Sequence, residues 1–233
     1  MLRNIMILLA GANLFSCQNK VQNNQPVNEK IIAIQDSNTL DSNVVSTIEL
    51  VENKEGFKEV ILDNEYFLNE MKYATKDNFL KAKIYPCAKC YLRQQVSESL
   101  INASKIAKQK GYKLIVFDCY RPLSLQKKMF EIVSNKKYVA DPKKGSKHNR
   151  GAAVDVGLAN EDNTPLDMGT EFDDFSEKAH YSNSEISSIA KNNRLILRNI
   201  MTQAGFEPYE NEWWHFNFKN VDFPLSDFEW SCQ

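Results

Sequence analysis

The sequence predicts an α+β fold, in which a small antiparallel sheet is flanked by helices within a single domain. Three observations support this class. Apolar residues recur at helical spacing in three separate segments, the apolar β-branched runs between them are short, and helices and strands do not alternate regularly as they do in α/β folds. The part of the chain with these patterns, about 180 residues, fits one domain with a single core, and no internal repeat is visible.

The first 17 residues have the character of an export signal: they contain Arg3, an apolar run over residues 5–12, and Ser16 followed by Cys17. The run is too short for a membrane-spanning helix, which needs about 20 apolar residues. Its end resembles a bacterial lipoprotein cleavage box, in which Cys17 becomes an acylated N-terminus. We therefore expect residues 1–17 to be a lipoprotein-type signal peptide and the protein to be exported to the periplasm or the cell surface. An ordinary signal peptide and a cytoplasmic protein with a hydrophobic start are the alternatives.

Residues 18–55 are expected to form a polar tether, and residues 56–233 the folded domain. Up to about residue 46 the chain is rich in Asn, Gln, Ser and Asp. Such a composition buries too little apolar surface to offset the entropy of ordering the chain. Membrane contact is therefore expected only through a lipid at Cys17. The formal net charge of −1 argues against a nucleic-acid partner, and the sequence leaves the oligomeric state open.

The first predicted helix of the domain ends at Lys110 and Gly111, a basic residue and a glycine that suit a helix C-terminus. A short buried strand over residues 114–117 follows, and then a bend at residues 120–122, because a residue before proline prefers extended geometry. Arg121 is therefore expected at the end of a strand. The apolar positions of the helix are Val96, Leu100, Ala103 and Ala107.

Two further helices are predicted by the same spacing of apolar residues. The second begins at Ser124, and the third extends from Ser184 to Ala204, with Gly205 as its stop. The positions expected to face the core are Leu125, Met129 and Ile132 in the second helix and Ile189, Ile196 and Ile200 in the third.

Asp155 is the only ionisable residue of the segment 152–158, whose short apolar sequence predicts a buried strand. A buried carboxylate without a partner is costly, so Asp155 is expected to be neutral, ion-paired or bound to a cation. His148 lies seven residues before it, a spacing that a straight strand would place on the opposite face. Gly151 permits a turn that brings His148 beside Asp155.

The Trp-Trp-His-Phe-Asn-Phe segment also predicts a strand, and this strand carries His215. With His148 and Asp155, it would complete a set of two imidazoles and one carboxylate, typical of a catalytic zinc site with one position open to water. Glu212 can take a proton from water there if it lies at the bend where the strand begins. His-x6-Asp alone is a weak signal, but two of the three histidines fall in these two segments. The third, His180, is expected at the surface.

These motifs resemble those of a known family. Ser-x-His-x-x-Gly-x-Ala-x-Asp at residues 146–155, followed by Glu-Trp-Trp-His at residues 212–215, is similar to the zinc D-alanyl-D-alanine dipeptidases. The likeness covers roughly residue 56 to the C-terminus, and two residues depart from it: Lys147 replaces a second serine, and Cys119 a small residue. Four further segments resemble the family in the same order, namely 72–75 (Lys-Tyr-Ala-Thr), 77–79 (Asp-Asn-Phe), 118–122 (Asp-Cys-Tyr-Arg-Pro) and 168–173 (Met-Gly-Thr-Glu-Phe-Asp).

The resemblance implies a single Hedgehog/D,D-peptidase-like zinc domain that hydrolyses the D-alanyl-D-alanine dipeptide and binds one zinc ion per chain. It assigns the role of base to Glu212 and that of transition-state stabiliser to Arg121. Asp173 suits a free ammonium by its charge. The zinc ligands that the resemblance implies are His148, Asp155 and His215, and the substrate-binding residues are Tyr73, Ser146 and Asp173.

Two other functions are compatible with these residues. One is a zinc D,D- or L,D-carboxypeptidase that trims peptidoglycan stem peptides, and the other is a non-catalytic, zinc-dependent binding protein of the envelope. Glu212 argues against the second, because a pure binding protein has no use for a base at the open coordination position.

Five cysteines stand at positions 17, 87, 90, 119 and 232. Cys87 and Cys90 form a Cys-x-x-Cys pair, but a structural zinc site needs two further ligands. If Cys17 is acylated, four thiols remain in an oxidising compartment and allow three disulfide pairings. The sequence does not choose among these pairings.

Overall fold

The computed structural model describes residues 50–52, 56–135 and 139–232 of the 233-residue chain. The expected signal peptide with Cys17, and most of the expected tether, lie outside the described residues. Strand β1 (Leu50–Glu52) falls inside the range expected as tether and pairs with β2 (Phe57–Val60) in antiparallel register. An ordered strand therefore precedes residue 56, the expected start of the domain.

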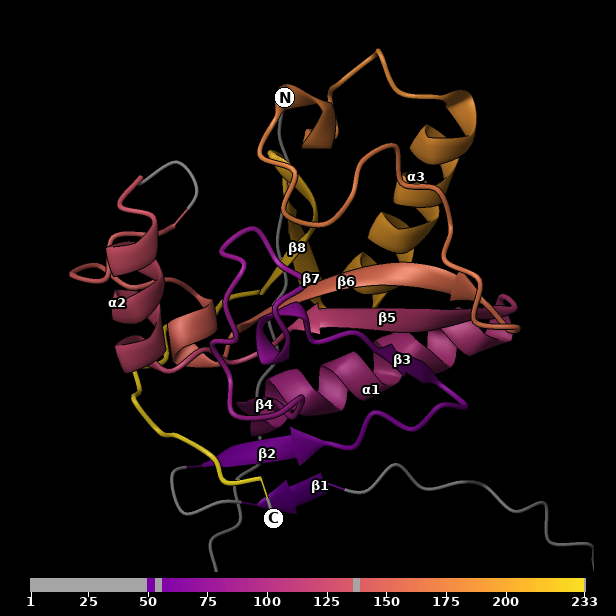
Figure 1. Ribbon diagram of the computed structural model, residues 1–233. Coiled ribbons are helices and arrows are strands. Elements are labelled where there is room, and N and C mark those ends of the chain that lie inside the picture. The colour runs from indigo at the N-terminus through magenta and orange to yellow at the C-terminus, as the bar shows by residue number, and fades with distance from the viewer. Residues whose placement is uncertain (1–49, 53–55, 136–138, 233) are drawn as a thin grey trace, which may run out of the picture. The chain divides into compact units, whose positions relative to one another are not determined.

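Within the described residues the strands form two sheets (Figure 1). One has three antiparallel strands in the order β1-β2-β4. The other has five strands in the order β3-β5-β6-β8-β7, in which every neighbouring pair is antiparallel except β3 and β5. The remaining strands are β3 (Phe67–Asn69), β4 (Cys90–Arg93), β5 (Tyr112–Asp118), β6 (Ala153–Asn160), β7 (Phe206–Tyr209) and β8 (Glu212–Phe218).

Helices flank these sheets, and the α+β class is confirmed. The longer helices are α1 (Gln94–Gln109), α2 (Leu123–Ile132) and α3 (Ser188–Gln203). Short 3-10 helices are η1 (Lys72–Ala74), η2 (His148–Arg150) and η3 (Glu177–Ala179). Helix α1 contacts β5 of one sheet and β2 and β4 of the other, so it packs between them (Figure 1). In the part of the chain that the structure describes, no helix combines the length and apolar character needed to cross a membrane.

The first predicted helix and the predicted strands are confirmed. All four apolar positions expected on α1 are buried, and Gly111 follows its end with a positive φ of 80°. Strands β5 and β8 cover two of the three segments expected as strands, and β6 covers the third except for Ala152; β6 is buried along nearly its whole length. Arg121 follows the end of β5, as expected.

Two positions expected in the core are exposed instead. Ile132 is 45% exposed, because it is the last residue of α2 and the buried face of that helix ends at Met129. Ile189 is 65% exposed in α3, which begins at Ser188 rather than at Ser184. Two of the buried positions on α3 are polar, and their side chains bond backbone carbonyls of another segment. These bonds are Asn193 to Asp167 at 2.8 Å and Arg194 to Met168 at 2.7 Å.

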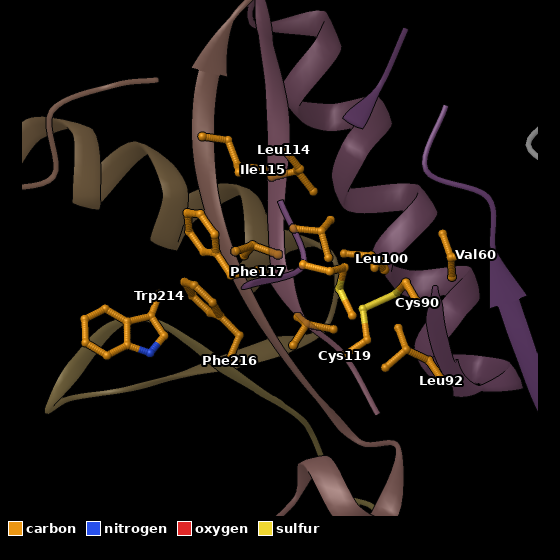
Figure 2. Packing of buried hydrophobic residues seen from close by; sticks show 14 of the residues in the cluster. Val60, Cys90, Leu92, Leu100, Leu114, Ile115, Phe117, Cys119, Trp214 and Phe216 are labelled. Atoms are coloured by element: carbon orange, nitrogen blue, oxygen red, sulfur yellow. A yellow bond between two sulfur atoms is a disulfide. The ribbon is translucent and has the colours of Figure 1, made fainter. Parts of the chain in front are cut away.

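The apolar core lies between α1 and the two sheets, and Figure 2 shows Leu92, Leu100 and Leu114 converging from β4, α1 and β5. A disulfide between Cys90 and Cys119 crosses this cluster from β4 to the residue after β5 (Figure 2). A second disulfide joins Cys87 to Cys232 near the C-terminus. The structure thus adopts one of the three pairings that the sequence leaves open.

Candidate active site

Strand register brings two of the expected zinc ligands together. Asp155 on β6 lies directly opposite His215 on β8 in the antiparallel ladder. Their side chains are in contact, with His215 Nδ1 at 3.0 Å from Asp155 Oδ1. Because the ladder fixes both Cα positions, this contact is built into the main chain of the sheet.

His148 reaches the same point from the turn before β6. It opens the 3-10 helix η2, and Gly151 ends that helix in the left-handed region with φ of 65°. A side chain at Gly151 would also collide with Phe57. The turn places His148 Nε2 at 3.3 Å from Asp155 Oδ1 and 3.1 Å from His215 Nδ1. The ligand cluster, His148, Asp155 and His215, therefore forms as the glycine turn predicts, with its three ligand atoms within 4.8 Å of one another.

The outer nitrogens of both imidazoles already have acceptors. His148 Nδ1 lies 2.7 Å from the carbonyl oxygen of Cys119, and His215 Nε2 lies 3.0 Å from Asn217 Oδ1. When each ring carries its hydrogen on the outer nitrogen, both inner nitrogens present lone pairs to the Asp155 carboxylate. In this tautomer the three atoms can hold a cation between them, and two nitrogens with one oxygen suit zinc.

In the absence of a cation, the buried Asp155 depends on the two imidazoles. Burial opposes its ionisation, but the charges and hydrogen bonds of His148 and His215 hold the pKa of Asp155 below its ordinary value. Burial likewise disfavours the charged form of His215, but the hydrogen bond and charge of Asp155 raise its pKa to about 9. A metal ion that binds here must displace the proton that His215 holds.

Glu212 lies at the edge of the ligand cluster. It is the first residue of β8, opposite Tyr209 at a register shift of the β7–β8 pair, so it occupies the expected bend. Its Oε2 lies 3.9 Å from His215 Nδ1, and its side chain is 26% exposed. Burial raises the pKa of Glu212 above the ordinary value of a glutamate. The carboxylate is thus a better proton acceptor than one in open water.

Arg121 is buried in a polar network that sequence reasoning did not identify. Its Nη2 donates to Asp118 Oδ2 at 2.6 Å, its Nη1 to Gln126 Oε1 at 2.9 Å, and its Nε to the Tyr85 hydroxyl at 3.3 Å. The Tyr85 hydroxyl in turn donates to Asp118 Oδ1 at 2.7 Å. These four residues, Arg121, Asp118, Tyr85 and Gln126, are called the arginine cluster below. The three contacts engage three of the five guanidinium N–H groups.

Tyr73 and Asp173, two of the expected substrate-binding residues, are in contact. The Tyr73 hydroxyl lies 3.0 Å from Asp173 Oδ2, and the Arg121 guanidinium lies over the Tyr73 ring at 5.0 Å. Burial and the charge of Asp155 raise the pKa of Asp173 well above its ordinary value. Asp173 also has a positive φ of 61°, a conformation that costs a residue with a side chain about 1–3 kcal/mol. The backbone strain marks Asp173 as a candidate functional residue.

Ser146, Lys147 and His180 have hydrogen bonds outside the ligand cluster. The Ser146 hydroxyl donates to Asn149 Oδ1 at 3.1 Å and so supports the turn that carries His148. Lys147 directs its ammonium to the carbonyl of Val221 at 3.0 Å. His180, expected at the surface, is half-buried, and its backbone carbonyl accepts a hydrogen bond from Arg194 at 3.0 Å.

Two cavities lie near these residues. One, of about 570 Å³, is lined by Phe117, Phe172 and Trp213 among others, and no residue of the ligand cluster lines it. The other, of about 290 Å³, is lined by Asp173 and by Asp77. The aromatic rings of Phe117 and Phe172 are stacked at 4.9 Å behind Asp173, so the loop that carries this aspartate is packed against the sheet.

Comparison with known proteins supports a family assignment. A profile of the peptidase M15 family, described as D-ala-D-ala dipeptidase, matches residues 56–230. The D-alanyl-D-alanine dipeptidase of Escherichia coli K12 is 37% identical over 164 residues, which cover 70% of this chain and 85% of that protein. The D-alanyl-D-alanine dipeptidase of Enterococcus faecium is 34% identical over 185 residues, which cover 69% of this chain and 90% of that protein. The solved LdcB LD-carboxypeptidase is 25% identical with a TM-score of 0.39, over 55% of this chain and 59% of that one. The chain therefore belongs to the D-ala-D-ala dipeptidase family of zinc peptidases.

Proposed function

We propose that the chain hydrolyses the D-alanyl-D-alanine dipeptide with one zinc ion held by the ligand cluster. Glu212 is the base in this proposal, and Arg121 stabilises the transition state. The observation that carries it is the convergence of three ligand atoms within 4.8 Å, with a carboxylate 3.9 Å from one of them. The substrate follows from the relatives at 37% and 34% identity, which are both D-alanyl-D-alanine dipeptidases.

Zinc bound at the ligand cluster supplies a Lewis acid and lowers the pKa of water at the site. Glu212 accepts a proton from the attacking water as the water oxygen bonds to the peptide carbonyl carbon. The same carboxyl then passes the proton to the amide nitrogen as the C–N bond breaks, and two alanine molecules result. The raised pKa of Glu212 favours the first transfer, because a stronger acceptor takes the proton more readily at neutral pH.

Arg121 supports this reaction through charge. Negative charge develops on the carbonyl oxygen during the attack, and a fixed guanidinium in a dry site stabilises such charge strongly. The positive charge of Arg121 acts on the carboxyls of both Glu212 and Asp173 and opposes the rise in pKa that burial gives each of them. Its buried contacts to Asp118 and Gln126 hold the guanidinium in one orientation.

Asp173 and Tyr73 are the proposed site for the ammonium end of the dipeptide, and Ser146 is a further proposed contact of the substrate. An ammonium beside Asp173 would favour its ionised form, which burial otherwise disfavours. A stem peptide has an acylated nitrogen where the dipeptide has its free amine. A buried carboxylate left without its cation is costly, so this contact favours the dipeptide over the carboxypeptidase alternative.

A substrate panel tests the proposal. The chain from residue 18 onward, loaded with zinc, is assayed on D-Ala-D-Ala, L-Ala-L-Ala, N-acetyl-D-Ala-D-Ala and a stem pentapeptide. We expect free D-Ala-D-Ala to be hydrolysed fastest by a wide margin. Preferential trimming of the pentapeptide would support the carboxypeptidase alternative, and zinc binding without any hydrolysis would support the binding-protein alternative.

We also propose that the enzyme is an exported lipoprotein anchored through Cys17. Disulfides persist mainly in oxidising compartments, and the chain carries the Cys87–Cys232 and Cys90–Cys119 pairs. Outside the inner membrane the dipeptide would come from the breakdown of cell-wall material, so a role in scavenging or turnover follows. Full-length protein should fractionate with membranes, and Cys17→Ser should release it. Recovery of the wild type in the cytoplasm with an intact N-terminus would contradict the location.

A further inference from the structure

We infer that the Cys90–Cys119 disulfide is a positioning element of the active site, which holds His148 and the arginine cluster in their working orientation. This inference rests on the proposed function, because it concerns the same zinc ligand and the same arginine. It goes beyond a general stabilising role, since it assigns a local geometric effect to one disulfide and not to the other.

The first step concerns where the main chain leaves the sheet. The pairing of β5 with β6 is irregular between Val116 and Asp118, and residues 119–122 belong to no strand or helix. This segment is tied instead to β4 of the three-stranded sheet, through the disulfide to Cys90 and a hydrogen bond from Tyr120 N to the Tyr91 carbonyl at 3.0 Å. Figure 2 shows the disulfide bridging these two parts of the fold.

The second step concerns what Cys119 touches. Its carbonyl oxygen lies 2.7 Å from His148 Nδ1. This contact orients the imidazole ring so that Nε2 faces Asp155 and His215. The amide of Cys119 donates to Asp118 Oδ1 at 2.9 Å, and Asp118 Oδ2 accepts from Arg121 at 2.6 Å. A displacement of Cys119 would therefore move both the hydrogen-bond acceptor of a zinc ligand and the carboxylate that orients the arginine. Outer contacts of this kind tune metal affinity by about 10- to 100-fold.

The Cys87–Cys232 disulfide provides a matched comparison within the same chain. It ties the C-terminal segment to the chain just before β4, and the Cys87 carbonyl accepts from Trp230 Nε1 at 3.3 Å. The two cysteines that it joins are 145 residues apart, against 29 for Cys90–Cys119. Chain entropy therefore predicts that Cys87–Cys232 contributes more to global stability. The positioning role predicts the reverse order for zinc affinity and turnover.

The experiment compares two disulfide deletions in the oxidised chain from residue 18 onward. Cys90→Ala/Cys119→Ala removes the positioning disulfide, and Cys87→Ala/Cys232→Ala is the control. A third variant, Cys90→Val/Cys119→Ala, restores buried volume in case the first variant unfolds. Each is measured for melting temperature, for zinc affinity by competition with a chelator, and for kcat and KM on D-Ala-D-Ala at saturating zinc, at a temperature where all variants are folded.

We expect the Cys90/Cys119 variants to bind zinc about 10- to 100-fold more weakly, and to lose kcat by about 10-fold or more when saturated with zinc. The control should keep both values within about twofold while its melting temperature falls further. Unchanged zinc affinity and kcat in folded Cys90/Cys119 variants, or equal losses in the control, would overturn the inference. If the wild type binds zinc but leaves D-Ala-D-Ala intact, the proposed function fails, and the zinc affinities still decide the positioning role.

Discussion

The ligand cluster and the arginine cluster lie at the same end of neighbouring strands, yet they are held in different ways. Asp118 at the end of β5 is paired with Asp155 on β6. The ligand cluster is positioned by the main chain, through the ladder opposite His215 and a glycine turn before β6. The arginine cluster is positioned by side chains, because Arg121 contacts three side chains from separate segments. Strand register and a glycine turn therefore place the three candidate ligands, and a hydrogen-bond network places the Arg121 guanidinium.

Their charges differ as well. The three potential ligand atoms of the ligand cluster lie within 4.8 Å of one another and could hold a cation. The arginine cluster needs no added ion, since the Asp118 carboxylate neutralises the Arg121 guanidinium at 2.6 Å. Metal binding and charge stabilisation should then respond to different substitutions. The following variants test this separation.

The largest effect is expected from the ligands themselves. His148→Ala, Asp155→Ala and His215→Ala each leave two ligands, too few for a tight site, so bound zinc should fall from one per chain to a negligible amount and turnover should vanish. Metal analysis after gel filtration and the dipeptidase assay check both. His180→Ala is the control, because His180 lies outside the ligand cluster, and it should retain full zinc. Normal zinc content in His148→Ala would refute the assignment.

Glu212→Gln should separate binding from chemistry. The amide keeps the shape of the side chain but accepts no proton, so kcat should fall by about 10²- to 10⁴-fold while zinc content stays at one per chain. Steady-state hydrolysis of D-Ala-D-Ala gives kcat, and metal analysis of the same sample gives the zinc content. A Glu212→Gln enzyme that works near the wild-type rate would remove Glu212 from the role of base.

Arg121→Lys addresses the arginine cluster alone. An ammonium cannot reproduce the planar donor that contacts Asp118 and Gln126, so kcat should fall by about 10²- to 10³-fold with zinc affinity unchanged. Steady-state kinetics and chelator competition check the two quantities. An unaltered kcat would return Arg121 to a structural role, and a loss of zinc would contradict the separation of the two clusters.

The same difference explains how much of the site was predictable. The ligand cluster follows from local patterns, because a lone carboxylate in an apolar strand, a glycine turn and a histidine strand are visible along the chain. The arginine cluster also includes Tyr85 and Gln126, whose neighbours in sequence do not mark them as functional. Only the spacing of Asp118 and Arg121 within one short motif offers a signal. The outer contact from the Cys119 carbonyl is invisible to sequence, since any residue has a carbonyl.

The fold shows the same limit. Helix α1 and the strands were predictable from apolar periodicity, because most of their buried positions are apolar. The buried face of α3 includes Asn193 and Arg194, whose burial depends on carbonyls of a distant loop. A prediction that treats polar residues as exposed therefore places Ile189 on the buried face, although it is exposed. The choice of disulfide pairing likewise depends on which segments the finished fold brings together.

The smallest effects should come from residues that contact a zinc ligand or Arg121 from outside the reacting groups. They test most directly whether zinc affinity and kcat depend on different clusters. Asn217→Ala removes the acceptor 3.0 Å from His215 Nε2, so zinc affinity should fall by about 10-fold while kcat at saturating zinc is nearly kept. Tyr85→Phe removes the hydroxyl that contacts Asp118 and Arg121, so kcat should fall by about 10-fold with zinc affinity unchanged.

Tyr85→Phe keeps the size of the side chain and Asn217→Ala shortens it, and the two alter outer contacts of different clusters, so their crossed effects are informative. Chelator competition reports zinc affinity, and kcat is read on zinc-saturated enzyme for both variants and for the double variant. If the clusters are independent, the losses should add in free energy within about 0.5 kcal/mol. A Tyr85→Phe enzyme that loses zinc as strongly as Asn217→Ala would show instead that the arginine cluster helps to hold the ligands, through Asp118 and the carbonyl of Cys119.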